Sequence, residues 1–167
     1  MSIVLGIDPG SQVMGYGALR IHGRGVHSTV ELISCGVIAP PTTLAFNERI
    51  GIIADELEIL ISELKPSITV IERVFLGKNA DSAFKLGHAR GIAVALAVRS
   101  GSEVVEYAAR AVKKGITGNG GATKEQVQLV LFSALGLRGQ TRADASDALA
   151  LAFYHARNLE SEWEIER

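Results

Sequence analysis

Two carboxylates follow short apolar segments at positions where a sheet can present them to a substrate. Asp8 comes directly after the apolar run 3–7, and Glu72 comes directly after the β-branched run 67–71. If these runs are neighbouring parallel strands, both carboxylates lie at one edge of the sheet, where open α/β sheets bind ligands. Each also has a simpler interpretation, since Asp8 can belong to an ordinary turn and Glu72 can be a solvated residue after a strand.

Two further carboxylates, Asp144 and Asp147, are three positions apart in a segment with helical character, so both point to one face. That face continues through Ala148 and Leu151, and a carboxylate pair leading into an apolar stripe is costly unless a cation compensates it. Asp144 can instead complete a capping box with Thr141 or favour the helix dipole. Asp147 has the weakest structural explanation, because it lies inside an Ala- and Leu-rich segment.

A cluster of these four acids would repel itself and raise the pKa of its members. Divalent cations remove that penalty, and hard oxygen ligands suit Mg²⁺, which binds a few carboxylates together with substrate phosphate oxygens. Two such ions about 4 Å apart activate a water and stabilise a leaving alkoxide in phosphodiester cleavage. The four acids together therefore point to metal-dependent phosphodiester hydrolysis.

The segments that must position these residues change between strand and helix patterns. Periodicity and turn residues predict strands at 3–7, 13–21, 31–38, 67–71 and 102–107, and helices at 44–64, 79–100, 123–136 and 143–159. The first three strands form an antiparallel meander. The order predicts an α/β fold with one five-stranded mixed sheet flanked by helices on both faces.

Two glycine-rich features of the pattern have more than one interpretation. A loop through Gly115 and Gly121 is either an ordinary mobile connector or a set of backbone amides that contact phosphates, and it lacks the ending of a nucleotide P-loop. Small residues recur every four positions in the helix at 79–100, which lets another backbone approach closely, from the sheet or from a second subunit; they are Ala83, Gly87, Gly91 and Ala95.

Length and composition indicate an ordinary globular chain. The 167 residues, 47% of them apolar, fit a single domain over 1–160 followed by an acidic tail at 161–167. The single cysteine, Cys35, excludes a disulfide framework and suits a reducing cytoplasm. Neither a targeting signal nor an apolar stretch near the ~20 residues of a membrane span is found, so we expect a cytoplasmic protein without membrane contact.

The formal net charge of −1 hides an uneven distribution. Residues 73–124 contain nine basic and three acidic residues, giving +6, while the rest of the chain carries −7. The four candidate metal ligands are all among the acids outside that segment. The near-neutral total therefore does not exclude a nucleic-acid-binding protein, and binding to phosphates should be salt-sensitive.

Four stretches together closely resemble one known family. They are GIDPGSQVMGYG (6–17), VIERVFLGKNADSAFKLGHARG (70–91), EYAARAVKKGITGNGGATKEQVQ (106–128) and ADASDALALAFYHA (143–156). They are similar to the RuvC family of crossover junction endodeoxyribonucleases, the bacterial Holliday junction resolvases. The resemblance implies a ribonuclease-H-like fold, a homodimer and Mg²⁺-dependent cleavage of two symmetry-related strands of a four-way DNA junction.

The resemblance also implies roles for individual residues. By motif position, the metal-site acids are Asp8, Glu72, Asp144 and Asp147, with two Mg²⁺ per active site and Mn²⁺ as a substitute. Lys124 lies close to the active site and serves catalysis, and Phe75 stacks on bases near the junction point. The expected DNA contacts are Phe75, Lys78, Asn79, Arg110, Lys113, Lys114 and Lys124. Arg73 departs from the family, which usually has Gln after the glutamate.

The implied reaction is in-line hydrolysis that leaves a 5′-phosphate and a 3′-hydroxyl, in homologous recombination and DNA repair. The family works with a branch-migration motor of the RuvA and RuvB type. Two alternatives remain. An ATPase of the actin-like class also opens with strand-Asp-x-Gly, but needs two such domains. A non-catalytic junction-binding protein would have no need of four acids.

Overall fold

The computed structural model describes residues 2–23, 29–73, 79–137 and 142–165, with side chains described up to Leu159. The strands are β1 (Ser2–Asp8), β2 (Met14–His22), β3 (Thr29–Ile38), β4 (Ile68–Glu72) and β5 (Glu103–Tyr107). The helices are α1 (Phe46–Leu64), α2 (Ala80–Arg99), α3 (Ala109–Thr117), α4 (Lys124–Leu135) and α5 (Ala143–Ile165).

The strands form one mixed sheet in the order β3-β2-β1-β4-β5. The first three strands are antiparallel neighbours, whereas β4 runs parallel to β1 and β5 runs parallel to β4. Ile7 pairs with Ile71 in the register of β1 and β4. The two strands therefore end at the same edge of the sheet, with Asp8 and Glu72 at the next position of each.

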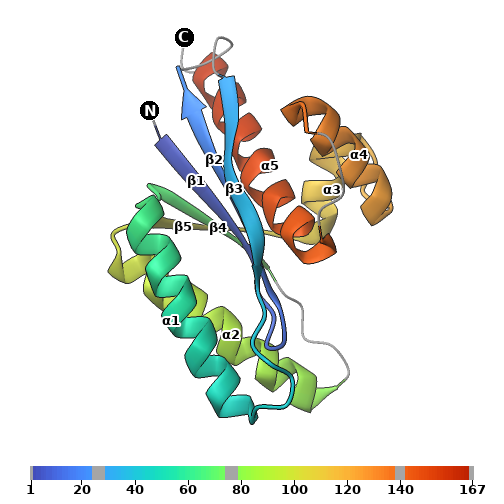
Figure 1. The fold of residues 1–167 in the computed structure, drawn as a ribbon. Helices are drawn as coiled ribbons and strands as arrows, with labels where there is room; N and C mark the ends of the chain where they lie inside the picture. The colour runs from blue at the N-terminus through green and yellow to red at the C-terminus, as the bar shows by residue number, and fades with distance from the viewer. Residues whose placement is uncertain (1, 24–28, 74–78, 138–141, 166–167) are drawn as a thin grey trace.

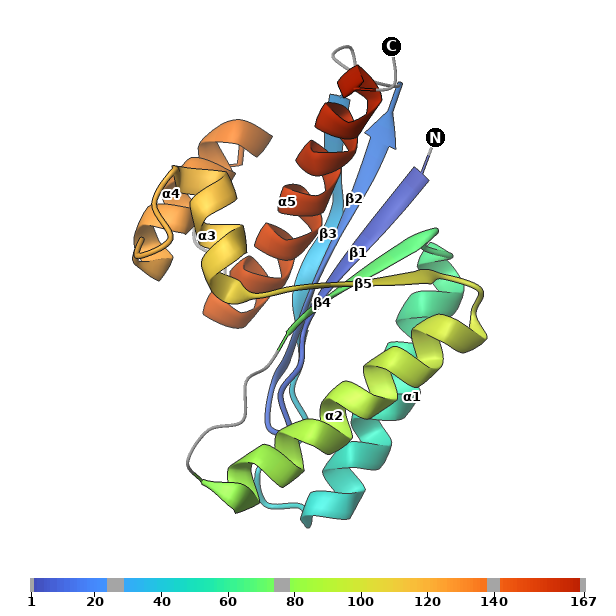
Figure 2. The same ribbon diagram turned by 180° about the vertical axis from the view of Figure 1, so that it is seen from behind.

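Helices cover both faces of the sheet. Figures 1 and 2 show α1 and α2 against one face and α5 along the other, with α3 and α4 beside α5. The apolar core is accordingly split, with Val4 and Val70 packed on the α5 side and Leu5 and Ile71 on the side of α1 and α2. The predicted five-stranded mixed sheet with helices on both faces is confirmed.

Glycines in the strands let α5 lie unusually close to the sheet. A Cβ at Gly6 would lie 2.0 Å from the carbonyl oxygen of Ala148, and one at Gly15 would lie 2.0 Å from that of Asp144. Neither position can carry a side chain without moving the helix backbone. The bare backbone of β1 and β2 thus sets the height of α5 above the strand ends, and with it the height of Asp147.

One helix was not predicted from the sequence. The segment expected to hold only a glycine-rich loop begins with α3, which includes Gly115 and ends at Gly118, a left-handed C-cap with φ of 78°. Gly115 lies within α3 rather than in a loop. A Cβ at this position would lie 2.1 Å from the Tyr154 ring of α5, so the glycine makes room for that ring. Val112 and Ile116, four positions apart and packed in the core, give the segment its helical signal.

Two other helices differ from expectation in part. The last helix was expected to end near residue 159, but α5 continues to Ile165, so most of the expected acidic tail is helical. The small residues of α2 do not face the sheet, because a Cβ at Gly87 or Gly91 meets no atom within 4 Å. The helix packs instead through Ala89, Ala93 and Ala97, which are buried.

The predicted capping box at the start of α4 is confirmed. The backbone N–H of Gln126 donates to the Thr123 hydroxyl at 3.3 Å, and the backbone N–H of Thr123 donates to the Gln126 side chain at 2.9 Å. This box fixes where α4 begins and therefore where its first residue, Lys124, projects. Within the described part of the chain, the helices are all too short or too polar to cross a membrane.

Candidate active site

Asp8 and Glu72 are adjacent at the strand ends and interact directly. Side chains alternate along a strand, so both carboxyls continue the rows of Val4 and Val70 on the α5 side of the sheet. Burial, together with the negative charges of Glu72 and Asp147, raises the pKa of Asp8 to about 7, and the charge of Lys124 acts in the opposite direction. Asp8 is also hydrogen-bonded to Glu72. Burial likewise raises the pKa of Glu72, and its hydrogen bond with Asp8 opposes that rise.

Asp147 approaches this pair from α5 and carries a cationic partner from α4. The Lys124 ammonium donates a hydrogen bond to Oδ2 of Asp147. This hydrogen bond is the main cause of the raised pKa of Lys124, and partial burial works against it. Lys124 remains 60% exposed at its side chain, whereas Asp147 is 30% exposed. The ammonium thus covers one side of the acidic cluster and remains open to solvent.

These residues line one hollow between the strand ends and the three C-terminal helices. Its polar groups are Asp8, Glu72, Asp147, Lys113 and Lys124, and Ala109, Val112, Val127, Ala150 and Leu151 form its apolar wall. Three carboxylates and two ammonium groups therefore share one water-accessible space. Such a mixture suits a substrate that carries negative charge and a cation that bridges it to the carboxylates.

Asp144 is not part of this hollow. Its carboxylate lies 4.0 Å from the guanidinium of Arg142 and is 40% exposed. The charge of Asp144 still contributes to the raised pKa of Lys124, so the two side chains interact electrostatically. The expected capping partner, Thr141, lies outside the described residues. Of the four expected metal-site acids, the structure brings three together around one space.

The described residues hold no ready-made metal cluster: their His, Cys, Asp and Glu side chains form no group of three or more placed to coordinate an ion. The donor chemistry nevertheless suits a hard divalent cation, because three carboxylates line the hollow. Burial is the main cause of the raised pKa of both Asp8 and Glu72, and the charge of Asp147 adds to it, so a bound cation would favour their charged forms. Asp147 lines the same hollow while one of its oxygens accepts the hydrogen bond from Lys124.

Four of the expected DNA contacts lie on α3 and α4, and Asn79 directly precedes α2. Lys113 lines the acidic hollow, Lys114 is exposed, and Arg110 lines a second hollow beside it. Asn79 caps α2, since its side chain accepts a hydrogen bond from the backbone N–H of Ser82 at 3.1 Å. Phe75 and Lys78 lie outside the described residues.

One cluster of ion pairs was not predicted from the sequence, because its residues are far apart along the chain. Glu106 of β5 forms ion pairs with Arg90 of α2 and with Arg73, which follows β4. Nothing in the sequence indicated which charged residues of this region pair with each other, although Arg73 was noted as a departure from the family. A second unpredicted contact joins the Tyr107 hydroxyl to Nδ1 of His155 at 2.9 Å.

Sheet order, parallel neighbours that end in acids, and a helix that adds a third acid define a nuclease of the ribonuclease-H-like class. The model of the family described as "Crossover junction endodeoxyribonuclease RuvC" matches residues 4–155. The chain therefore belongs to the RuvC family of crossover junction endodeoxyribonucleases, and the resemblance noted in its four sequence stretches is confirmed.

Individual relatives agree with this assignment. A RuvC of Bdellovibrio bacteriovorus is 47% identical over 165 residues, which cover 99% of this chain and 96% of the relative. A RuvC of Marinobacter nauticus is 45% identical over 161 residues, covering 96% and 89%. Among solved structures, "T. thermophilus RuvC in complex with Holliday junction substrate" is similar with a TM-score of 0.86 and 28% identity, covering 97% of each chain. The predicted ribonuclease-H-like fold is thereby confirmed.

Proposed function

We propose that this chain resolves four-way DNA junctions by paired, symmetric, Mg²⁺-dependent phosphodiester hydrolysis, leaving 5′-phosphate and 3′-hydroxyl ends. The observation that carries the proposal is the hollow in which Asp8, Glu72 and Asp147 face Lys113 and Lys124. Family membership and the junction-bound relative support the choice of substrate. The reaction belongs to homologous recombination and DNA repair in the bacterial cytoplasm.

The carboxylates are proposed to hold Mg²⁺, with Mn²⁺ as a substitute and two ions per site. Asp8, Glu72 and Asp147 supply the oxygens from the hollow, and Asp144, which lies 4.0 Å from Arg142 outside it, is proposed as the fourth ligand. The bound ions supply Lewis-acid activation of water and stabilise the departing 3′-oxygen. A bound cation would offset both the burial that mainly raises the pKa of Asp8 and the added repulsion from Glu72 and Asp147.

The two lysines position and neutralise the scissile phosphate. Lys113 lines the hollow from α3, and Lys124 is presented by the capped start of α4. When Asp147 turns from Lys124, the ammonium is released to contact a phosphate oxygen. A charge placed in advance where negative charge develops lowers the barrier without further reorganisation. Lys124 is thus proposed to exchange a carboxylate for the substrate.

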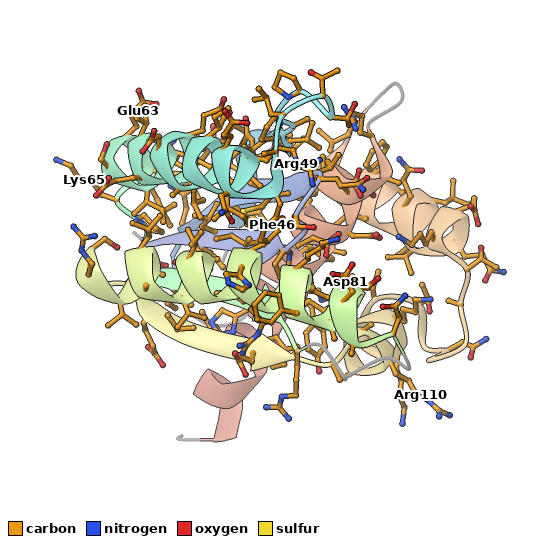
Figure 3. The ribbon with its side chains drawn as sticks, turned by 90° about the horizontal axis from the view of Figure 1, so that it is seen from below. Phe46, Arg49, Glu63, Lys65, Asp81 and Arg110 are labelled. Atoms are coloured by element: carbon orange, nitrogen blue, oxygen red, sulfur yellow. The ribbon has the colours of Figure 1, made fainter. Side chains whose placement is uncertain are left out.

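The same proposal includes a homodimer built on α2. Gly87, Gly91 and Ala95 are exposed on this helix, and beside them Phe84 is 65% exposed and Val98 59% exposed. Figure 3 shows α2 alongside α1 on the outer face of the molecule. A face that combines small residues with large apolar ones suits close contact between helices of two copies. A twofold dimer places two sites on opposing strands, matching the junction's symmetry.

The remaining parts of the proposal follow from the family. Residues 1–160 are proposed to form one nuclease domain. Phe75, Lys78, Asn79, Arg110 and Lys114 are proposed to extend the DNA surface beyond the hollow. A branch-migration motor of the RuvA and RuvB type is the proposed protein partner.

The test mixes the purified protein with a synthetic four-way junction and Mg²⁺. We expect paired nicks at symmetric positions that a ligase seals without prior treatment of the ends. Asp8→Asn and Asp147→Asn should abolish nicking and leave junction binding largely intact. Cutting of linear duplex as fast as the junction, or ends that a ligase cannot seal, would contradict the proposal.

A further inference from the structure

A second hollow lies beside the acidic one and shares Asp8 and Glu72 with it. Its other polar lining comes from Arg73 and Arg110, and its apolar lining includes Leu86. Asp8 and Glu72 therefore form the border between two spaces of different character. The first is lined by carboxylates and ammonium groups, and the second adds two guanidinium groups.

Arg73 lies on the other face of the sheet from Glu72. The backbone N–H of Arg73 donates to the Tyr107 carbonyl at 2.8 Å, which continues the ladder between β4 and β5 by one residue. Side chains alternate along such a ladder, so Glu72 points to the α5 side and Arg73 to the α2 side. The contact of Arg73 with Glu106, which itself pairs with Arg90 of α2, agrees with this placement. The second hollow thus wraps around the end of the sheet.

Glu106 holds Arg73 without neutralising the cluster. Arg90 pairs with one oxygen of Glu106, and Nε of Arg73 lies 4.0 Å from the other. One carboxylate between two guanidinium groups leaves a net positive charge. The side chain of Arg73 is 58% exposed, and its approach through Nε leaves the terminal amino groups for another ligand. Arg90 and Glu106 are more covered, at 32% and 28% exposed, so they form the fixed part of the cluster.

Arg110 reaches the hollow from α3, on the opposite side. Gly120 packs against it, since a Cβ there would lie 2.9 Å from Cγ of Arg110. In Figure 3, Arg110 is at the margin of the molecule, on the side where α2 begins at Asp81. Two guanidinium groups from separate elements therefore line one space together with apolar residues such as Leu86, beyond the border formed by Asp8 and Glu72, and this combination suits a phosphate with its sugar and base.

We propose that this second hollow binds the phosphodiester next to the scissile one on the cleaved strand, with Arg73 as its principal ligand and Arg110 opposite. The inference rests on the proposed function and extends it. A strand whose scissile phosphate lies in the acidic hollow reaches the shared border of Asp8 and Glu72 at its next linkage. Arg73 then holds the linkage next to the scissile phosphate, while the lysines of the first hollow hold the scissile phosphate itself, and together they orient the cleaved bond for in-line attack.

The test combines Arg73→Gln with junctions that carry a single neutral methylphosphonate at successive linkages around the cleavage position. Binding is measured in EDTA, where no cutting occurs. We expect the neutral linkage beside the scissile one to weaken binding of the unsubstituted protein about tenfold. The variant should already bind about tenfold more weakly and lose nothing further at that one linkage. Its slope of log affinity against log salt should be smaller by about 1.

Two variants separate this subsite from a merely structural ion pair. Arg73→Lys should keep the salt slope but not the full affinity, because an ammonium lacks the two-pronged contact. Arg20→Gln serves as the matched control, since Arg20 is also paired with a glutamate, Glu31, on the far part of the sheet. It should behave like the unsubstituted protein at every linkage, and thermal denaturation should show that all variants are folded.

The outcomes of this test distinguish a failure of the phosphate subsite from a failure of the proposed function. If Arg73→Gln stays as sensitive to every neutral linkage as the unsubstituted protein, the subsite is wrong even though the junction is cut. If the junction is bound with the expected pattern but never cut in Mg²⁺, the proposed function fails and the phosphate subsite stands. An unchanged salt slope in Arg73→Gln would also overturn the subsite.

Discussion

The Lys124 ammonium of α4 donates a hydrogen bond to the Asp147 carboxylate of α5 at the mouth of the acidic hollow. This contact gives Asp147 a cationic partner beside the other acids of the proposed metal site. It also ties the position of α4 to that of α5, because Lys124 follows directly on the capping box at Thr123. The pair therefore connects the proposed metal site with the lysine that is proposed to contact the scissile phosphate.

Lys124→Gln should tighten metal binding and weaken cleavage at the same time. Without the ammonium, Asp147 is free to join Asp8 and Glu72, and we expect Mn²⁺ to bind about fivefold more tightly in titration calorimetry without DNA. Cleavage of the junction should fall about 100-fold, because the phosphate loses its neutralising group. Lys114→Gln is the control for metal binding, since Lys114 is exposed outside the hollow. Unchanged or weaker metal binding in Lys124→Gln would contradict the exchange.

Asp8→Asn should change how stability depends on pH in the absence of metal. The folded pKa of Asp8 is about 7 against an ordinary value of 3.8, so between those values the folded protein keeps a proton that the unfolded chain releases. The free energy of unfolding should therefore fall as pH rises from about 4 to 7, by on the order of 4 kcal/mol. In Asp8→Asn the free energy of unfolding should not show this fall with pH.

Urea denaturation in EDTA at pH 4.5 and pH 8 checks this expectation. The two proteins should differ little at the lower pH, and the variant should be the more stable at the higher one. Mg²⁺ should then stabilise the unsubstituted protein more than Asp8→Asn. Parallel pH profiles for the two proteins would show that Asp8 pays no burial cost in the folded state.

Gly6→Ala should destabilise the fold by moving α5 away from the sheet. The added Cβ would lie 2.0 Å from the Ala148 carbonyl oxygen, so the helix that carries Asp147 must shift. We expect a loss of about 3 kcal/mol in denaturant unfolding. Gly51→Ala is the matched control, because a Cβ there meets no atom within 4 Å on α1. That variant should gain about 0.7 kcal/mol from helix propensity.

Gly91→Arg should separate the proposed dimer from the fold of each copy. A side chain at Gly91 meets no atom within 4 Å of the same chain, so the monomer should keep its melting temperature within a few degrees. Sedimentation velocity should show a shift from dimer to monomer, and nicking should become unpaired. Ser133→Arg, at an exposed position of α4, should remain dimeric. A fully dimeric Gly91→Arg would place the interface elsewhere.

Most of the elements could be predicted because their signals are local. The apolar runs before Asp8 and Glu72, the capping box at Thr123 and the periodicity of α1 all depend on residues a few positions apart. The α3 helix was missed because its glycine at position 115 suggested a loop. That glycine serves tertiary packing instead, as it makes room for the Tyr154 ring.

The candidate site also combines features that the sequence determined with features that only the fold determined. The sequence by itself determined which acids and lysines were available, which strand ends and helix carried them, and the family to which the chain belongs. Only the tertiary structure decided that Asp8, Glu72 and Asp147 share one hollow, that Asp144 turns to Arg142, and that Lys124 pairs with Asp147. Likewise, only the fold brought Arg73, Arg90 and Glu106 together. Such pairings depend on strand register and on how closely helices approach the sheet, and these distances are set by packing between segments far apart in the chain.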